Sequence, residues 1–355
     1  MSVCSYHLFN KLGLCTNEGH WKFRRHLHVV CSFNCSYKFG VGKDIIWTDR
    51  KADYIRDDNY VDGNLLLAIS HKVMTYSSDG GFELIAGGNS GARYKEGVRD
   101  KAGFGWVTSL RQINSTALVV VDKSSHCIRL IDRETNGTSQ FAGNCTVSGG
   151  ASAMCSSQQC TFDHPYDIQL NDFEEDFLYI TDASNHAIRR MDLVNNSVSI
   201  FIADVKGPRY IEFDNKNQVM YVTIETGLLR VPVIDVELRS LVLATAVSND
   251  FFGLALLDSN TVVVAALKSN SVQVALLEGS NSSASNICVK PKKMKVEARK
   301  KHKMETPFRC EVYVPYSVAV VHGALLIGQV NFVKRIAFSS ELHSSLPHIR
   351  KLYAY

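Results

Sequence analysis

Short apolar runs separated by polar turns recur along the chain. Residues 118–132 and 178–192 show the pattern most clearly: an apolar run ends at an Asp, a polar turn follows, and a second apolar run begins. When the two segments are aligned on Asp122 and Asp182, a His, an Ile, an Arg and a final Asp also coincide. Apolar runs bounded by Asp, Ser and Asn are typical of β-strands joined by tight turns, so each segment predicts a β-hairpin.

Weaker copies of this hairpin extend the pattern along the rest of the chain. Six hairpins are predicted, centred near residues 70, 125, 185, 226, 269 and 330. An apolar stretch precedes most of them, opened by Pro165, Pro208 or Pro315, and Pro is tolerated at the first residue of a strand. A further strand follows the hairpin, as in residues 139–144. Each unit therefore supplies four strands, as a propeller blade of roughly 40–45 residues does.

These residues resemble the NHL repeat. The resemblance rests on an Ala-Gly outer strand, a Phe, an entry Pro and the Asp, Asn-His and Ile-Arg of the hairpin, and it is strongest over residues 80–205. It implies an all-β fold, a six-bladed β-propeller of four-stranded antiparallel blades. We expect one end of the chain to complete a blade begun by the other, with Tyr37–Ile45 or Leu346–Tyr355 as the closing outer strand.

The repeats divide the chain into two regions. Residues 1–36 form a Cys-containing N-terminal segment of unknown structure, and residues 37–355 form the propeller, with a basic insert at 289–309. No apolar stretch reaches the roughly 20 residues that span a bilayer, and no apolar run of a signal peptide follows Met1.

Ten cysteines and several Asn-x-Ser/Thr sequences favour an extracellular or lumenal location. We predict a disulfide between Cys145 and Cys160, with Cys155 left free or paired elsewhere, and a second one between Cys288 and Cys310. Cys127, inside a strand pattern, is expected to be free. The predicted glycosylation sites lie in loops between blades, at Asn136, Asn144, Asn195 and Asn281.

The residues with catalytic potential are better explained by structure. His126 and His186 occupy equivalent turns of successive blades, where we expect local hydrogen bonds and not metal ligation. Asp122 and Asp182 are expected to form turns, and Arg129 and Arg189 recur for the same reason. The entry strands offer few groups to a metal in the central channel, namely Asp167, Tyr210, Glu212 and Ser317, with His164 beside the entry Pro. We therefore expect no metal, no cofactor and no enzymatic activity.

The basic insert is the sharpest charged feature, and its residues cannot pack into a core. It is either a solvated loop or a contact for a polyanion. Its candidate binding residues are Lys290, Lys292, Lys293, Lys295, Arg299, Lys300, Lys301 and Lys303.

Three functions fit these features. The preferred one is a non-catalytic scaffold that binds a protein or glycan through its loop faces. The alternatives are an intracellular RNA-binding NHL module like that of tripartite-motif proteins, and a channel-centred, metal-dependent enzyme resembling lyases or lactonases. The sequence fixes neither the ligand nor the oligomeric state.

Overall fold

The described residues are built almost entirely from β-strands. The computed structural model describes residues 94–277, except 115, 172–173, 246 and 249. It also describes residues 29–32, 43–47, 65–69, 71–77, 81–88, 283–289, 310–312, 314–321, 324–328 and 333–337. Helical structure in these residues is limited to three short 3₁₀ turns, η2 (Arg99–Lys101), η3 (Lys123–Ser125) and η4 (Val236–Leu238). None of the described helices is long and apolar enough to cross a membrane.

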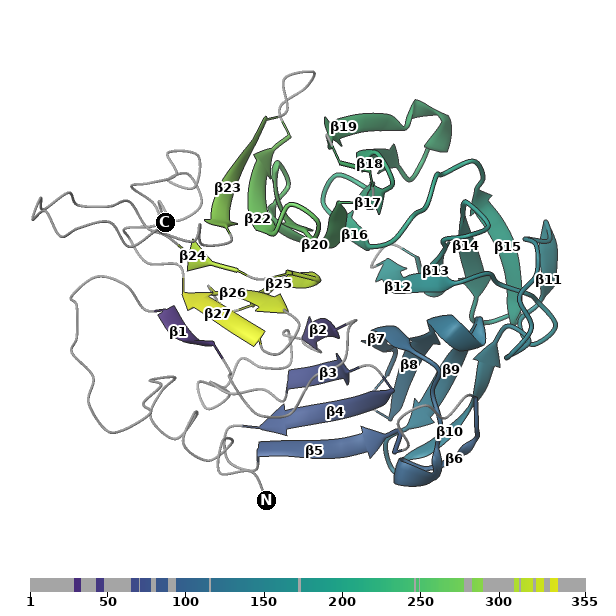
Figure 1. Ribbon diagram of the computed structural model, residues 1–355. Helices are drawn as coiled ribbons and strands as arrows, with labels where there is room; N and C mark the ends of the chain where they lie inside the picture. The colour runs from purple at the N-terminus through teal and green to yellow at the C-terminus, as the bar shows by residue number, and fades with distance from the viewer. Residues whose placement is uncertain are drawn as a thin grey trace, which may run out of the picture.

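The strands form six sheets, which lie around a common centre (Figure 1). The first contains β2 (Lys43–Trp47), β3 (Leu65–Ile69), β4 (Lys72–Ser77) and β5 (Gly81–Ala86). The second contains β7 (Val107–Gln112), β8 (Ala117–Asp122), β9 (Cys127–Asp132), β10 (Gly137–Ala142) and β6 (Gly97–Val98). The third contains β12 (Pro165–Asn171), β13 (Glu174–Asp182), β14 (Ala187–Asp192), β15 (Ser197–Ile202) and β11 (Met154–Ser156).

The second half of the chain repeats this arrangement. The fourth sheet contains β16 (Ile211–Asp214), β17 (Val219–Ile224), β18 (Gly227–Pro232) and β19 (Ser240–Ala244). The fifth contains β20 (Phe251–Asp258), β21 (Thr261–Ala266), β22 (Ser271–Leu276), β23 (Ser283–Val289) and β24 (Cys310–Glu311). The sixth contains β25 (Ser317–Val321), β26 (Ala324–Gly328), β27 (Val333–Ala337) and β1 (Val29–Ser32). The expected all-β propeller architecture is confirmed, and each predicted hairpin supplies the two middle strands of one sheet.

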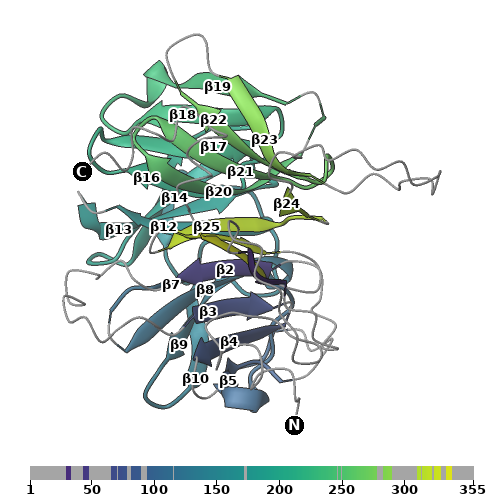
Figure 2. The ribbon, with the colours of Figure 1, turned by 90° about the vertical axis from the view of Figure 1, so that its left-hand side faces the viewer.

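The two ends of the chain meet in the sixth sheet. Strand β1 pairs antiparallel with β27 and is the outer strand of that sheet. The innermost strands β2 and β25 also contact each other, as the side view shows (Figure 2). A closing outer strand was expected from one end of the chain, and the N-terminal side supplies it, but not at the proposed Tyr37–Ile45. Residues 29–32 close the sheet, whereas Lys43–Trp47, which overlaps the proposed Tyr37–Ile45, is the innermost strand of the first sheet. Residues 346–355 lie outside the described part of the chain.

The core lies between neighbouring sheets. Strand β21 illustrates the consequence, because all six of its residues are buried and five of them, all but Thr261, are apolar. The Ala-Gly and Phe positions of the repeat form the junction between two successive sheets. Gly143 has a φ of +87°, and a Cβ atom there would lie 2.7 Å from the ring of buried Phe162. Only glycine fits this approach without strain.

Candidate functional site

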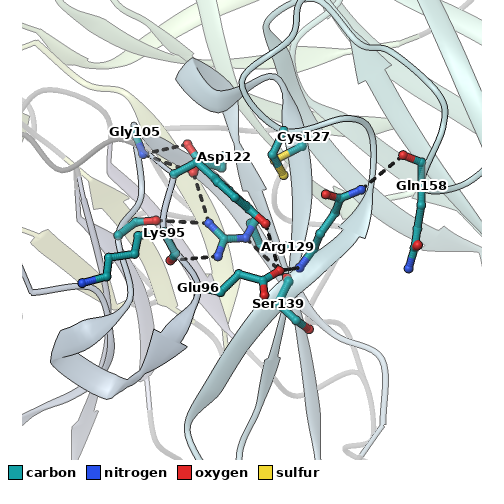
Figure 3. Close-up of a disulfide and its surroundings, with 12 residues drawn as sticks. Lys95, Glu96, Gly105, Asp122, Cys127, Arg129, Ser139 and Gln158 are labelled. Atoms are coloured by element: carbon teal, nitrogen blue, oxygen red, sulfur yellow. Dashed lines mark hydrogen bonds and ion pairs between the residues drawn. A yellow bond between two sulfur atoms is a disulfide. The ribbon is translucent and has the colours of Figure 1, made fainter.

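In the second and third sheets the recurring Asp and Arg form a buried ion pair, and the Asp holds the loop that enters the same sheet. Asp122 accepts hydrogen bonds from the backbone N–H groups of Gly105 (2.9 Å) and Trp106 (3.0 Å). The guanidinium of Arg129 lies 3.7 Å from the Asp122 carboxylate and donates to the carbonyls of Gly103 and Lys95, both at 3.1 Å (Figure 3). Both side chains are fully buried, and burial lowers the pKa of Arg129.

The third sheet repeats this unit with fewer contacts. Arg189 lies 3.2 Å from the carboxylate of Asp182, which accepts the backbone N–H of Asp163. Arg189 also donates to the carbonyl of Ser152 at 3.0 Å, while its buried Nε has no hydrogen-bond partner. Burial raises the pKa of Asp182. The recurring Asp and Arg residues thus have a structural role, but not the expected turn-forming one: the carboxylates hold the loop that enters the sheet and pair with the Arg side chains.

The recurring His residues connect one sheet to the next. Nδ1 of His126 accepts the backbone N–H of His164 at 3.2 Å, and Nδ1 of His186 accepts that of Gly207 at the same distance. Both His residues have positive φ angles, of 56° and 54°. The expected local hydrogen bonds are confirmed.

One junction adds chemistry that the others lack. The carboxylate of Asp163 lies 3.3 Å from Nδ1 of His126 and 2.7 Å from Nδ1 of His164, and the two imidazole rings are 4.5 Å apart. His164 is nearly half exposed. Ligand atoms of all three residues fall within 4.8 Å of one another, close enough to hold a metal ion. Nδ1 of His126 accepts a backbone N–H, so only its Nε2 is open to a metal ion. Burial, followed by the charge of His164, lowers the pKa of His126.

The polar groups of the central channel are used to join the inner strands. Asp167 is almost fully buried and accepts the Ser109 hydroxyl (2.5 Å) and the backbone N–H of Ile211 (2.8 Å). Gln169 accepts from Arg111 at 2.6 Å and donates to Glu212 at 3.0 Å. This hydrogen-bond chain connects β7, β12 and β16. Burial raises the pKa of Asp167. Asp167 and Glu212, which the sequence offered as possible metal ligands, therefore both belong to this hydrogen-bond network and are occupied by it.

An aromatic rim surrounds the end of the channel at which the inner strands begin. It is contributed by the segments that open five successive inner strands: Trp106, Tyr166, Tyr210, Phe252 and Tyr316. The ring of Tyr166 lies 5.4 Å from that of Tyr210 and 6.1 Å from that of Phe252, which in turn lies 6.2 Å from Tyr316. Three of these rings are more than nine-tenths buried, whereas Trp106 and Phe252 are only partly buried. Of the five rim residues, only Tyr210 was named from the sequence as a candidate site residue, and it was considered there as a possible metal ligand.

Two cations lie on this rim. Nζ of Lys123, in the turn between β8 and β9, is 4.8 Å from the ring centre of Tyr166 and 5.5 Å from that of Trp106. The guanidinium of Arg209 is 4.3 Å from the ring of Phe252. Burial, and then the charge of Arg209, lowers the pKa of Lys123. Within the described part of the chain Lys123 has no carboxylate partner, so a positive charge is held uncompensated among aromatic rings.

The cysteine pairing differs from the prediction. The disulfides join Cys127 to Cys145 and Cys155 to Cys160, so the proposed Cys145–Cys160 bond and the free Cys127 were wrong. The reason is register: Ile128 pairs with Ala142, which brings Cys127, the first residue of β9, opposite the residues that follow β10. Cys288 and Cys310 are register partners in the parallel pair β23–β24, and the bond between them stays a prediction.

The remaining predicted sites fall into two groups. Asn144 and Asn195 are exposed and Asn136 is partly exposed, each in a loop next to an outer strand. Asn281 and the whole cluster from Lys290 to Lys303 lie outside the described residues.

No protein-family model matches this chain, and no curated protein matches it. Solved structures do. The fold is that of a β-propeller. A gluconolactonase from Xanthomonas campestris has a TM-score of 0.55 at 10% identity, with 85% of this chain and 87% of that chain covered. Virginiamycin B lyase from Staphylococcus aureus, in an inactive form with quinupristin, has a TM-score of 0.54 at 11% identity, covering 86% and 98%. A nidogen/laminin complex has a TM-score of 0.52 at 11% identity, covering 75% and 85%. At these identities the likeness concerns the fold, which hosts binding domains and enzymes alike.

Proposed function

We propose that this chain is a six-bladed, NHL-type propeller that acts as a non-catalytic scaffold and binds a protein ligand through its aromatic rim. The six sheets and the β1–β27 pairing support six blades closed by the N-terminal strand. Deleting residues 1–34 should then broaden the unfolding transition. A transition of unchanged midpoint and width would contradict closure by β1.

The observation that carries the binding proposal is the rim itself. Tyr, Trp and Phe are enriched in protein interfaces, and a partly desolvated cation beside them favours an acidic group on the partner. Lys123 supplies that cation, while Trp106 and Phe252 present partly exposed rings. A related fold is known in a nidogen/laminin complex, which is a protein-binding precedent.

The enzymatic alternative is less well supported. Asp167 and Glu212, two carboxylates on the described inner strands, are hydrogen-bonded across those strands, so they contribute to the joining of blades. The RNA-binding alternative depended on the basic insert, which lies outside the described residues. We keep the insert as a proposed polyanion contact, secondary to the rim.

Site-specific photocrosslinking tests the proposal. A photoreactive phenylalanine analogue replaces Phe252 on the rim, and in the matched control it replaces Val194. Val194 is 67% exposed in the turn after β14, at the opposite end of the strands. In an extract of the native source, we expect a discrete protein adduct at position 252 and none at 194. The Lys123→Met variant should reduce this adduct about tenfold or more, the effect of losing a hydrogen-bonded charge. Equal labelling at both positions, or an adduct that a glycosidase removes, would refute a protein ligand at the rim.

A further inference from the structure

A cavity of about 560 Å³ lies between the fourth and fifth sheets, away from the aromatic rim. Ligand pockets commonly measure about 300–1,000 Å³, so the cavity has the size of a small-molecule site. Its floor is formed by one face of the fourth sheet. Tyr221 is the register partner of Arg230, and Arg230 is the partner of Ser240, so three strands place these side chains in one row. The facing wall comes from Ser259, Asn260 and Leu277.

The charges in the cavity are separated. Asp214 lies at the inner end, on β16, where Asn217 donates to it at 2.7 Å and the Ser259 hydroxyl at 3.4 Å. Arg230 lies on β18, two strand spacings farther out, which is roughly 10 Å. Its guanidinium is hydrogen-bonded to Tyr221, and within the described residues it forms no ion pair. Most of its five donors are therefore available to a ligand.

The remaining lining determines the kind of ligand. Hydroxyl and amide groups from Ser240, Asn217 and Asn260 can exchange hydrogen bonds with several hydroxyl groups, while Val242 and Leu277 offer an apolar patch. A single cation matches one carboxylate, bound bidentately by the guanidinium fork. A dianionic phosphate fits less well, because Asp214 lies in the same cavity without a second cation among the lining residues. Asp214 instead suits hydroxyl donors at the inner end.

We propose that this cavity binds an acidic monosaccharide, with the sugar carboxylate on Arg230, hydroxyl groups towards Asp214 and one C–H face on Val242 and Leu277. The site is independent of the ligand at the aromatic rim, so failure of either proposal leaves the other standing.

Calorimetric titration with D-glucuronate, and with D-glucose as the neutral analogue, tests this site. We expect saturable binding of glucuronate and an affinity for glucose that is lower by about tenfold or more, because glucose leaves the guanidinium unpaired. Arg230→Gln should weaken glucuronate binding by a similar factor and leave glucose binding unchanged. Arg239→Gln is the matched control, since Arg239 is the neighbouring arginine and does not line the cavity. It should change neither affinity.

Ser240→Trp provides an independent check. Ser240 is exposed on the outer strand β19, so the change should be tolerated by the fold, while the indole fills the cavity and abolishes binding of both sugars. The absence of saturable glucuronate binding to the folded protein would overturn the proposal. Equal affinities for the two sugars, or undiminished binding by Arg230→Gln or Ser240→Trp, would overturn it as well.

Discussion

Replacing Arg129 by Met should be among the most destabilising single changes in the chain. Met keeps much of the length of the side chain but removes the guanidinium, whose three nitrogens serve the carbonyls of Gly103, Lys95 and Ser139. The change also leaves the Asp122 carboxylate fully buried without its counter-ion. Breaking a buried pair by removing one partner costs about 3–5 kcal/mol. Against a total stability of roughly 5–15 kcal/mol, that loss is large.

Arg189→Met is an informative comparison with Arg129→Met, because Arg189 occupies the same position in the next sheet but contacts fewer carbonyl groups. Arg189 contacts one carbonyl, that of Ser152, and its Nε has no partner, so fewer acceptors are abandoned. We expect this variant to lose about 1–2 kcal/mol less than Arg129→Met, at roughly 1 kcal/mol per hydrogen bond. Arg133→Met, which removes only a 3.4 Å contact to Gln112, should stay within about 0.5 kcal/mol of the wild type.

Urea unfolding monitored by circular dichroism measures these differences as shifts of the midpoint at an unchanged slope. Adding Asp122→Asn to Arg129→Met should cost less than the sum of the two single changes, since the carboxylate no longer needs a partner. If Arg129→Met lost under about 1 kcal/mol, or no more than Arg133→Met, the buried pair would not stabilise the fold as argued.

Two further predictions concern His126 and the two disulfides. Because burial lowers the pKa of His126 below its usual value of about 6.5, the unfolded chain binds the proton first, and stability should fall as the pH decreases below that value. His126→Asn retains an acceptor for the next sheet but should lack this decline, so thermal unfolding from pH 8 to 5 that runs parallel in both proteins would contradict the assignment. Peptide mapping without reduction should recover Cys127–Cys145 and Cys155–Cys160, and removing the first bond should cost about 3 kcal/mol against about 2 for the second, by the loop-entropy estimate. A peptide joining Cys145 to Cys160 would show that the register of β9 and β10 is misassigned.

The hairpins could be predicted because their information is local. Each depends on an apolar run and a short polar turn, all within about 15 residues, and all six centres coincide with observed hairpins. The structural role of Asp122 and Arg129 also followed from their recurrence at equivalent positions. The particular partners did not, because Lys95 and Gly103 belong to the preceding loop.

The disulfides and the closing strand could not be predicted for a related reason. Both depend on register across strands, and sequence spacing does not specify it. Cys127 was assigned to a strand and excluded from pairing, although its position at the start of β9 brings it opposite Cys145. Strand β1 pairs with a strand about 300 residues later, and no local pattern marks that contact.

The aromatic rim did carry a signal in the sequence. Tyr166 and Tyr316 each follow an entry Pro directly, and Tyr210 and Phe252 occupy the corresponding stretch of their units. Aromatic residues recurring beside the first residue of the innermost strand would meet around the axis, because those strands begin at the same end. The cavity between the fourth and fifth sheets had no such signal, since it depends on how two neighbouring sheets pack.

The distribution of chemistry within the repeat explains where function can reside. Asp122, Asp182 and the recurring His side chains are engaged by backbone groups of the adjacent loops, so those positions are committed to assembling the ring. Positions that differ between units are free of that requirement. At the junction after His126 the next sheet supplies His164, whereas after His186 it supplies Gly207. His164, which departs from the repeat, is followed by Pro165 and then by the rim residue Tyr166. The rim residue Lys123 lies three residues before His126. The irregular ionisable residues thus gather on the face that bears the rim, where they are available to a ligand, while the regular junctions keep the ring intact.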